Sequence, residues 1–434
     1  MKNRLELYFQ FHELQTNWRT EILAGATTFV TMAYIIFVNP AILHETGMPL
    51  TAVVAATCLC AALGSLMMGI VARYPIALAP GMGLNAYFTY TVVKGMGVPW
   101  ETALGAVFLS GIAFLILTAV GLRQMIVAAI PVELYSAVAV GIGLFIALIG
   151  LRNSGIITAS KETLVTMGNL RNPSTLLAIF GLLLISALLA WEIRGAILIG
   201  ILGTSAIGAL FGLVQFHAQS YSVADITATA FHLNIRGALS YGLVEIIFVF
   251  LFVDLFDNIG TLVAVGKKAK LFDETNRIPR MNQILYADAT ATVLGSLAGT
   301  STVTSYVESA AGVAAGGRSG VTAVVTGILF FAALFVAPLV GAIPAAATAP
   351  ALIVVGSMMI VHATEIPWGN PVIAIPAFLT IVTIPLTFSI ANGLAFGFTA
   401  YTILKIARGE FRGVHWLVYL LTALFIARFF YLGS

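Results

Sequence analysis

The chain has 434 residues, of which 60% are hydrophobic and only 9% are charged, and its formal net charge is +3. Soluble domains carry about 25% charged residues, so this composition excludes an ordinary soluble protein and predicts an all-α polytopic membrane protein. The basic residues lie between apolar stretches rather than in one patch, which removes the electrostatic basis for nucleic-acid binding.

Residues 1–19 are polar and have no cleavable apolar core, so we expect a cytoplasmic N-terminal segment rather than a signal peptide. Most later apolar stretches are long enough to cross, or nearly cross, a hydrocarbon core of about 30 Å. They lie at 20–43, 51–72, 99–121, 131–151, 174–192, 194–214, 243–266, 283–299, 320–338, 346–361, 371–387 and 389–407. The last apolar run, from His415, is either an interfacial helix or a further span.

Two more segments, 76–96 and 298–316, have first halves rich in Gly, Pro, Ser and Thr. Each predicts a short extended strand followed by a half-helix. Irregular backbone at membrane depth is tolerated only where protein covers it or where it lines a cavity, so both segments should point inward. The alternative is a closely packed, glycine-rich helix. Counting both segments gives 14, seven in each half.

The two halves also resemble each other weakly, because Ala79–Gly97 aligns without a gap on Ala298–Gly316. An odd number of crossings per half places the second copy upside down, which is the inverted repeat of secondary transporters. The basic residues mostly favour a cytoplasmic N-terminus under the positive-inside bias.

Carboxylates inside apolar stretches are the main indication of function. Each costs about 3 kcal/mol at mid-bilayer, so such groups usually serve transport or proton movement. Asp254, Asp257 and Thr261 share one helical face. Two ionised carboxylates one turn apart repel, so one favours its protonated form and can exchange a proton. Glu308, expected in the first turn of the second half-helix, can accept hydrogen bonds from a ligand edge with adjacent N–H groups. Either group could instead be structural.

Four further residues complete the candidate substrate site. Asn85 lies at the junction of strand and half-helix in the first broken segment, where its amide can bind a ligand or close a local turn. Thr304 and Tyr306 lie on the second broken segment. Tyr306 and Phe256 could stack on a flat ring, although aromatic residues in helices often only pack. Asp288 receives no role.

Signatures of catalysis or metal binding are absent from the sequence. There is no P-loop, the six histidines lack metal-ligand spacing, and Cys58 and Cys60 are expected to pack within one helix. We therefore expect no metal, no cofactor and no enzymatic activity. A channel or a membrane enzyme is the alternative from another functional class.

Four motifs are specific: TEILAGATTFVTMAYIIFVNPAIL, APGMGLNAYFTY, FVDLFDNIGTLVAVG and GTSTVTSYVESAAGVAAGGRSG. Almost throughout, the chain resembles the azaguanine-type purine permeases of the nucleobase–ascorbate/xanthine–uracil transporter superfamily. The resemblance implies a 7+7 inverted repeat in which a core domain moves as an elevator against a gate domain. It assigns 20–121 and 243–338 to the core, 122–214 and 339–407 to the gate, and leaves 408–434 as a C-terminal interfacial helix.

The resemblance also implies a function, that of a proton-coupled importer of adenine, guanine or hypoxanthine in the plasma membrane, and it leaves a homodimer open. Matched by motif, Asp257 and Glu308 are its acidic site residues, and Asn85 and Asp254 match positions that the purine branch also uses. Thr261 stands where relatives among the xanthine and uracil permeases carry a histidine, and this departure favours adenine, guanine or hypoxanthine over uracil. Transport of uracil or xanthine, or of an inorganic anion, is the alternative within this fold.

Overall fold

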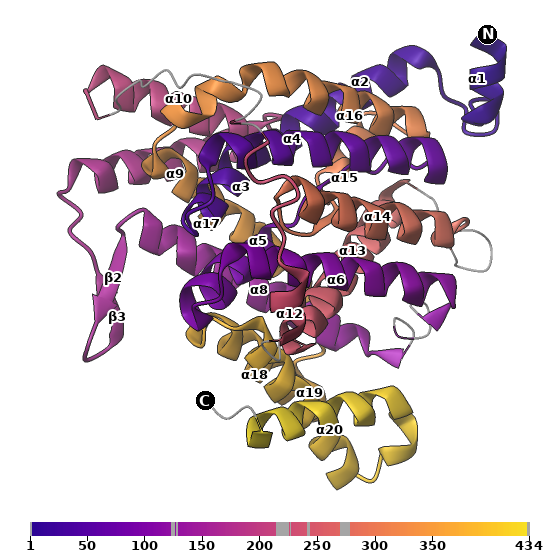
Figure 1. Cartoon of the computed structure of the whole chain (residues 1–434), viewed down its shortest axis with the longest axis vertical. Helices are drawn as coiled ribbons and strands as arrows, with labels where there is room; N and C mark the ends of the chain where they lie inside the picture. The colour runs from indigo at the N-terminus through magenta and orange to yellow at the C-terminus, as the bar shows by residue number, and fades with distance from the viewer. Residues whose placement is uncertain are drawn as a thin grey trace. The chain divides into compact units, whose positions relative to one another are not determined.

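The computed structural model describes residues 2–122, 126, 129–213, 225, 227–240, 244–269 and 278–431 (Figure 1). Seven of its helices are long and apolar enough to cross a membrane, by length and composition, within these ranges. Shorter apolar helices lie at Ala196–Leu210, Gly320–Ala333, Pro371–Leu386 and Trp416–Ala427. The chain is therefore an integral membrane protein that is mostly helical, as its composition predicts.

The elements of the first half follow the expected segments closely. They are α1 (Lys2–Tyr8), α2 (Trp18–Met32), α3 (Ile35–His44), α4 (Leu50–Met67), the π-helix η1 (Met68–Ala72), β1 (Leu78–Pro80), α5 (Met82–Ala86), the π-helix η2 (Tyr87–Gly95), α6 (Trp100–Ala119), α8 (Val132–Asn153), β2 (Ile157–Ser160), β3 (Leu164–Met167), α9 (Pro173–Ala190) and α10 (Ala196–Leu210).

The second half also consists mainly of helices, with one broken segment among them. Its elements are α12 (Ile235–Ser240), α13 (Val244–Ala269), α14 (Met281–Ala298), β4 (Val303–Ser305), α15 (Ser309–Ala314), α16 (Gly320–Ala333), the 3₁₀-helix η3 (Leu334–Ala342), α17 (Ala345–Met359), the 3₁₀-helix η4 (Ile360–Glu365), α18 (Pro371–Leu386), α19 (Ile390–Ala407), η5 (Phe411–Gly413) and α20 (Trp416–Tyr431).

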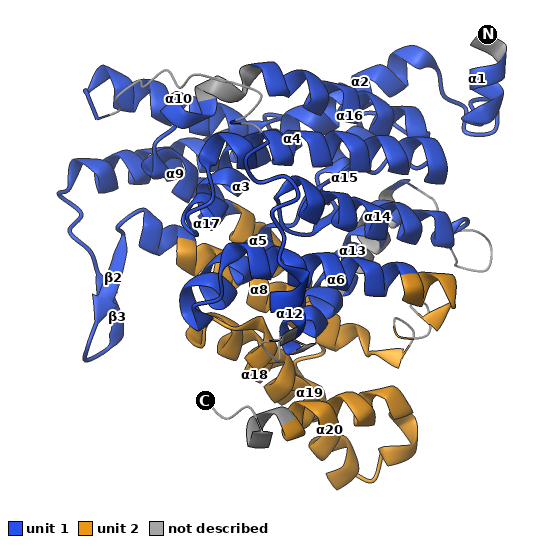
Figure 2. Ribbon diagram, in the orientation of Figure 1, with its two compact units in different colours: residues 1–115, 150–354 blue, residues 116–149, 355–434 orange. Residues whose placement is uncertain are grey.

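The chain divides into two compact units (Figure 2). Unit 1 holds residues 1–115 and 150–354, and unit 2 holds 116–149 and 355–434. Both broken segments and all the acidic candidates therefore belong to unit 1. The assignment of core and gate domains, with the boundaries given above, stays a prediction.

The two broken segments meet through their strands. β1 and β4 pair antiparallel with Ala79 opposite Thr304, and backbone bonds extend the pair at both ends, from Gly81 N to Thr302 O (2.9 Å) and from Tyr306 N to Ala77 O (3.0 Å). This pairing satisfies the polar groups of non-helical backbone, as buried irregular segments require. The expected strands and half-helices are thus present, in 76–96 and 298–316.

The gapless alignment of these segments is wrong in detail. It would place the counterpart of β1 at 297–299, the end of α14, whereas β4 begins six residues later, at Val303. The position of each strand is set by pairing with its partner, which a match of small residues does not detect. The halves correspond strand to strand only after this shift.

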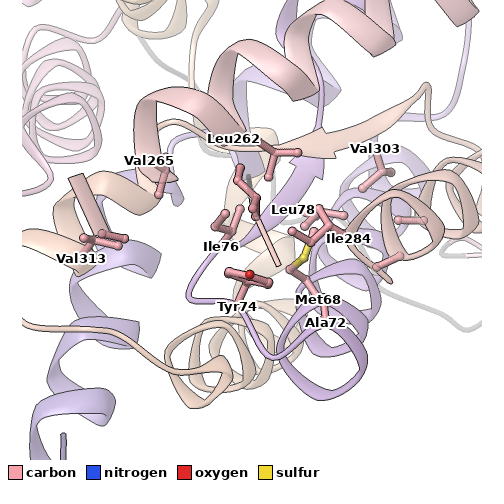
Figure 3. Packing of buried hydrophobic residues seen from close by; sticks show 14 of the residues in the cluster. Met68, Ala72, Tyr74, Ile76, Leu78, Leu262, Val265, Ile284, Val303 and Val313 are labelled. Carbon is pink, nitrogen blue, oxygen red and sulfur yellow. The ribbon is translucent and has the colours of Figure 1, made fainter. Parts of the chain in front are cut away.

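An apolar cluster supports the paired strands from one side. Leu78 of β1 and Val303 of β4 are fully buried in it together with Ile76, Leu262 and Ile284, and Figure 3 shows their side chains gathered between the surrounding helices. Burial of a side chain of this size stabilises the fold by about 1.5–3 kcal/mol. The strands are therefore held between α13 and α14 by packing as well as by hydrogen bonds.

The first apolar stretch differs from the expected continuous span. It divides into α2 and α3, with a turn at Ala33 and Tyr34 between them. Pro40 follows in α3, and because proline has no N–H it leaves the carbonyl of Ile36 without its usual helical donor. Weakened helical bonding beside the turn is consistent with this break, which brings the phenol of Tyr34 to the second broken segment.

Candidate functional site

The site is organised around Gly81, where β1 ends and α5 begins. A methyl group on this glycine would lie 3.6 Å from Oδ2 of Asp257, 3.7 Å from Oγ1 of Thr302 and 3.0 Å from Cγ2 of Thr304. The absence of a side chain therefore lets the carboxylate from α13 approach the two strands closely. Asp257 and Thr304, both predicted from the sequence, come together here.

Glu308 lies directly before α15, where it is the N-terminal cap residue. Its Oε1 accepts a 2.6 Å hydrogen bond from the hydroxyl of Tyr34. The nearby Tyr306 hydroxyl donates instead to the carbonyl of Pro80 in β1, at 2.5 Å. Glu308 and Asp257 are within electrostatic range of each other, so the structure brings the two predicted acidic residues near one another.

Two more carboxylates lie behind this pair. Asp254 and Asp288 are fully buried, whereas Asp257 and Glu308 keep partly accessible side chains. The hydroxyl of Thr292 donates to Asp254 at 3.4 Å, and Asp288 is the other acidic neighbour of Asp257. Asp288, which sequence reasoning left without a role, thus adjoins the site.

Several buried polar groups around the strands have no hydrogen-bond partner within the described part of the chain. They are the hydroxyls of Thr302, Thr304 and Ser305 and both amide atoms of Asn258. Such groups are rare in folded proteins, because an unsatisfied buried donor or acceptor costs about 1–3 kcal/mol. The three hydroxyls lie on β4 or directly before it, where a polar ligand could form hydrogen bonds with them.

The side-chain amide of Asn85 is occupied by hydrogen bonds to other residues of the protein. The residue is fully buried in α5, its amide nitrogen donates to Oδ1 of Asn39, and its Oδ1 accepts from the hydroxyl of Ser301. Asn39 in turn donates to Thr57 at 2.7 Å and to Thr300 at 3.0 Å. This buried network joins both broken segments to α3 and α4.

The other residues singled out in the sequence lie on α13 and α4. Thr261 is buried on α13, one turn beyond Asp257, and Phe256 also belongs to α13, although its side chain lies outside the described residues. Cys58 and Cys60 are buried thiols in α4, consistent with packing. In the described ranges, no group of His, Cys, Asp and Glu side chains has the arrangement of a metal site.

Sequence reasoning missed Tyr34 and Asn39. Both lie within the motif TTFVTMAYIIFVNP of the first apolar stretch, where a tyrosine is most simply interpreted as a packing residue. The available signal was an asparagine directly before a proline within a span, because a buried amide needs polar partners.

Residues 19–396 match the model of the Permease family of xanthine/uracil type. The chain belongs to this permease family. The permease is 54% identical to a Methanocaldococcus jannaschii protein named as a permease, over 99% of both chains. It is 46% identical to the guanine/hypoxanthine permease PbuG of Bacillus subtilis (99% and 100% covered) and 44% identical to the adenine permease AdeP of Escherichia coli (99% and 97%). The resemblance given by the motifs is thereby confirmed, as is the expectation of a transporter rather than an enzyme.

Solved structures add the fold. The transmembrane domain of the cyanobacterial bicarbonate transporter BicA matches with a TM-score of 0.65 at 17% identity, covering 85% of the permease and 95% of that domain. The murine anion transporter Slc26a9 in an inward-facing state matches with a TM-score of 0.67 at 12% identity, covering 91% and 69%. At these identities the likeness concerns fold alone.

Proposed function

We propose that the permease imports purine nucleobases, namely adenine, guanine or hypoxanthine, together with a proton across the plasma membrane. The relatives named adenine permease and guanine/hypoxanthine permease support the substrate class. The observation that carries the proposal is the proximity of Asp257 and Glu308 beside β4, whose buried hydroxyls have no hydrogen-bond partner among the described residues.

The chemistry of this site suits a purine. Asp257 and Glu308 are acceptors for the N–H groups of the base, because an ionised carboxylate offers about four lone-pair positions and no donor. The hydroxyl of Thr304, which can donate or accept, serves a ring nitrogen or a carbonyl group of the base. Tyr306 is the aromatic residue available to pack against the ring, and Thr261, one turn beyond Asp257 on α13, offers a further hydroxyl.

The coupled proton is carried by the carboxylates themselves. Asp257 and Glu308 lie close enough to interact and keep partly accessible side chains, and Asp254 lies one turn behind Asp257. Because like charges at short range oppose joint ionisation, a proton is shared within this group and its release can follow the release of the base. Asn85 acts here through its network with Asn39 and Ser301, holding the two broken segments together.

In this proposal the 14 segments form an inverted repeat, and the core domain moves past the gate domain with the base bound to it. An inorganic anion, the other candidate for this fold, is disfavoured because two carboxylates at the binding position repel it. Uracil and xanthine are the closer competitors.

The test is uptake of labelled hypoxanthine by cells expressing the permease, with adenine, guanine, xanthine and uracil as competitors and with or without a protonophore. Asp257→Asn and Glu308→Gln should each abolish uptake at an unchanged amount of membrane protein, because a neutral amide replaces an ionised acceptor. Glu192→Gln removes an exposed carboxylate after α9 and should leave uptake intact. Normal uptake by either site variant would remove that residue from the scheme, and insensitivity to the protonophore would remove proton coupling.

A further inference from the structure

Tyr34 occupies an unusual place for a tyrosine in a membrane span. It lies in the turn between α2 and α3, its side chain is 1% exposed, and its hydroxyl donates to Oε1 of Glu308 at 2.6 Å. Asp257 and Tyr306 are also within electrostatic range of this phenol. The first span thus reaches the acidic pair of the site through one side chain.

The same span also packs closely against α15 through α2. A methyl group on Gly312 would lie 2.0 Å from Oγ1 of Thr28 and 2.7 Å from the carbonyl oxygen of Ala24. No Cβ atom fits at such distances, so glycine is required for α15 to contact the backbone of α2. The contact leaves little freedom for α15 to slide or rotate against α2.

A second polar anchor holds the chain beyond α15. Glu21 of α2 is fully buried, and its carboxylate accepts hydrogen bonds from the backbone N–H groups of Arg318 (3.0 Å) and Ser319 (3.1 Å) and from the hydroxyl of Thr322 (2.6 Å). These donors surround the start of α16, where a negative charge is favoured by the helix dipole. The segment from Glu308 to Ser319 is therefore tied at one end to the turn after α2, through Tyr34, and at the other end to α2 itself, through Glu21.

We propose that Tyr34 is a positioning residue for Glu308, and that α2 serves as the rigid support from which it acts. This inference rests on the proposed function, since it assigns Glu308 to the binding of the purine. The hydroxyl of Tyr34 occupies Oε1 and orients the carboxylate, which leaves Oε2 to accept from an N–H group of the base. Hydrogen bonds to an ionised acceptor are short and strong, so one donor suffices to select one rotamer.

The decisive variant is Tyr34→Phe, which removes the donor and keeps the ring. We expect the KM for purine uptake to rise about tenfold, equivalent to about 1.4 kcal/mol, with a smaller change in maximal rate. Tyr74→Phe is the matched control, because the Tyr74 hydroxyl donates at 2.6 Å to a backbone carbonyl, that of Pro279, in the same unit. It should leave KM unchanged.

A double-variant cycle separates positioning from direct contact. Glu308→Asp shortens the side chain so that it no longer reaches the phenol, and adding Tyr34→Phe to it should then have little further effect on KM. Full additivity of the two changes would mean that Tyr34 contacts the base itself, and an unaltered KM in Tyr34→Phe alone would mean that it positions nothing. Either result overturns the proposal.

Infrared spectroscopy of the purified permease tests the link without transport. The carboxyl band assigned to Glu308, by its loss in Glu308→Gln, should shift in Tyr34→Phe and stay unchanged in Tyr74→Phe. If the wild-type permease took up no purine, the proposed function would fail while this band shift could still be observed. If the wild type transports and the band does not shift, the inference on Tyr34 fails alone.

Discussion

Buried hydroxyls of unit 1 fall into two groups, those that donate to the protein and those that have no partner among the described residues. Thr326 of α16 donates to the carbonyls of Gly25 and Thr322 at 3.0 and 2.9 Å. Thr304 of β4 is equally buried, yet within the described residues its hydroxyl has no partner. Deleting a satisfied hydroxyl removes a bond, whereas deleting an unsatisfied one removes a desolvation cost.

Thr304→Val should therefore leave the stability unchanged or slightly improved, while the KM for purine rises several-fold because the base loses a polar contact. Thr326→Val should show the opposite pattern, a loss of about 1 kcal/mol with unchanged KM. Thermal unfolding in detergent and uptake kinetics measure the two effects. A Thr304→Val permease with normal KM would exclude this hydroxyl from the site.

The acidic candidates could be selected from the sequence because an ionisable group in an apolar stretch has few explanations. Asp257 and Glu308 met that test and lie together. The role of Asn85 was harder to predict, because an amide serves a ligand or a protein network equally well, and here Asn39 and Ser301 occupy it. Tyr34 was not predictable, since its position depends on a helix break that apolar composition hides.

At the scale of elements, close approach of α14 to β4 decides where the site hydroxyls stand. A methyl group on Gly295 of α14 would lie 2.7 Å from Cγ2 of Val303 and 2.9 Å from the carbonyl oxygen of Ser301. Backbone atoms cannot withdraw as a flexible side chain can. Glycine at this position is thus a condition for the observed place of the strand.

Gly295→Ala should displace β4, and with it Thr304, at a cost of about 1–3 kcal/mol for overpacking. Uptake should fall together with the melting temperature. Gly203→Ala on α10 is the control, because its methyl group would meet only the end of the Leu184 side chain, at 3.1 Å, and alanine favours helix. Equal melting temperatures for the two variants would contradict the close approach.

Most helices could be predicted from the sequence, because the length of an apolar run and the residue that caps a helix are local features. Asn17, Asn172 and Ser319 cap α2, α9 and α16 with their side-chain oxygens. The alignment of distant segments could not be predicted in this way, as the six-residue error in aligning β1 with β4 shows. Pairing of strands that lie more than 200 residues apart is decided by packing that no local pattern records.

At the scale of the whole molecule, the odd number of segments in each proposed half determines which side of the membrane each loop faces. With a cytoplasmic N-terminus, the β2–β3 hairpin follows five crossings and should be external. The loop of η5 follows fourteen crossings and should be internal. Cys58 and Cys60 are 0% and 1% exposed, so neither native thiol should react with a thiol reagent added to label an introduced cysteine.

Glu162→Cys in the hairpin should therefore react with a membrane-impermeant maleimide in intact cells, whereas Arg412→Cys in η5 should react only after permeabilisation. Both native side chains are exposed, so access to reagent depends on the side of the membrane rather than on burial. The parent protein, with only its buried thiols, should stay unlabelled in both conditions. The proposed arrangement has an odd number of crossings between the two positions, so they must lie on opposite sides of the membrane. Labelling of both from the same side would mean an even number of crossings. The arrangement of seven inverted segments per half would then be wrong.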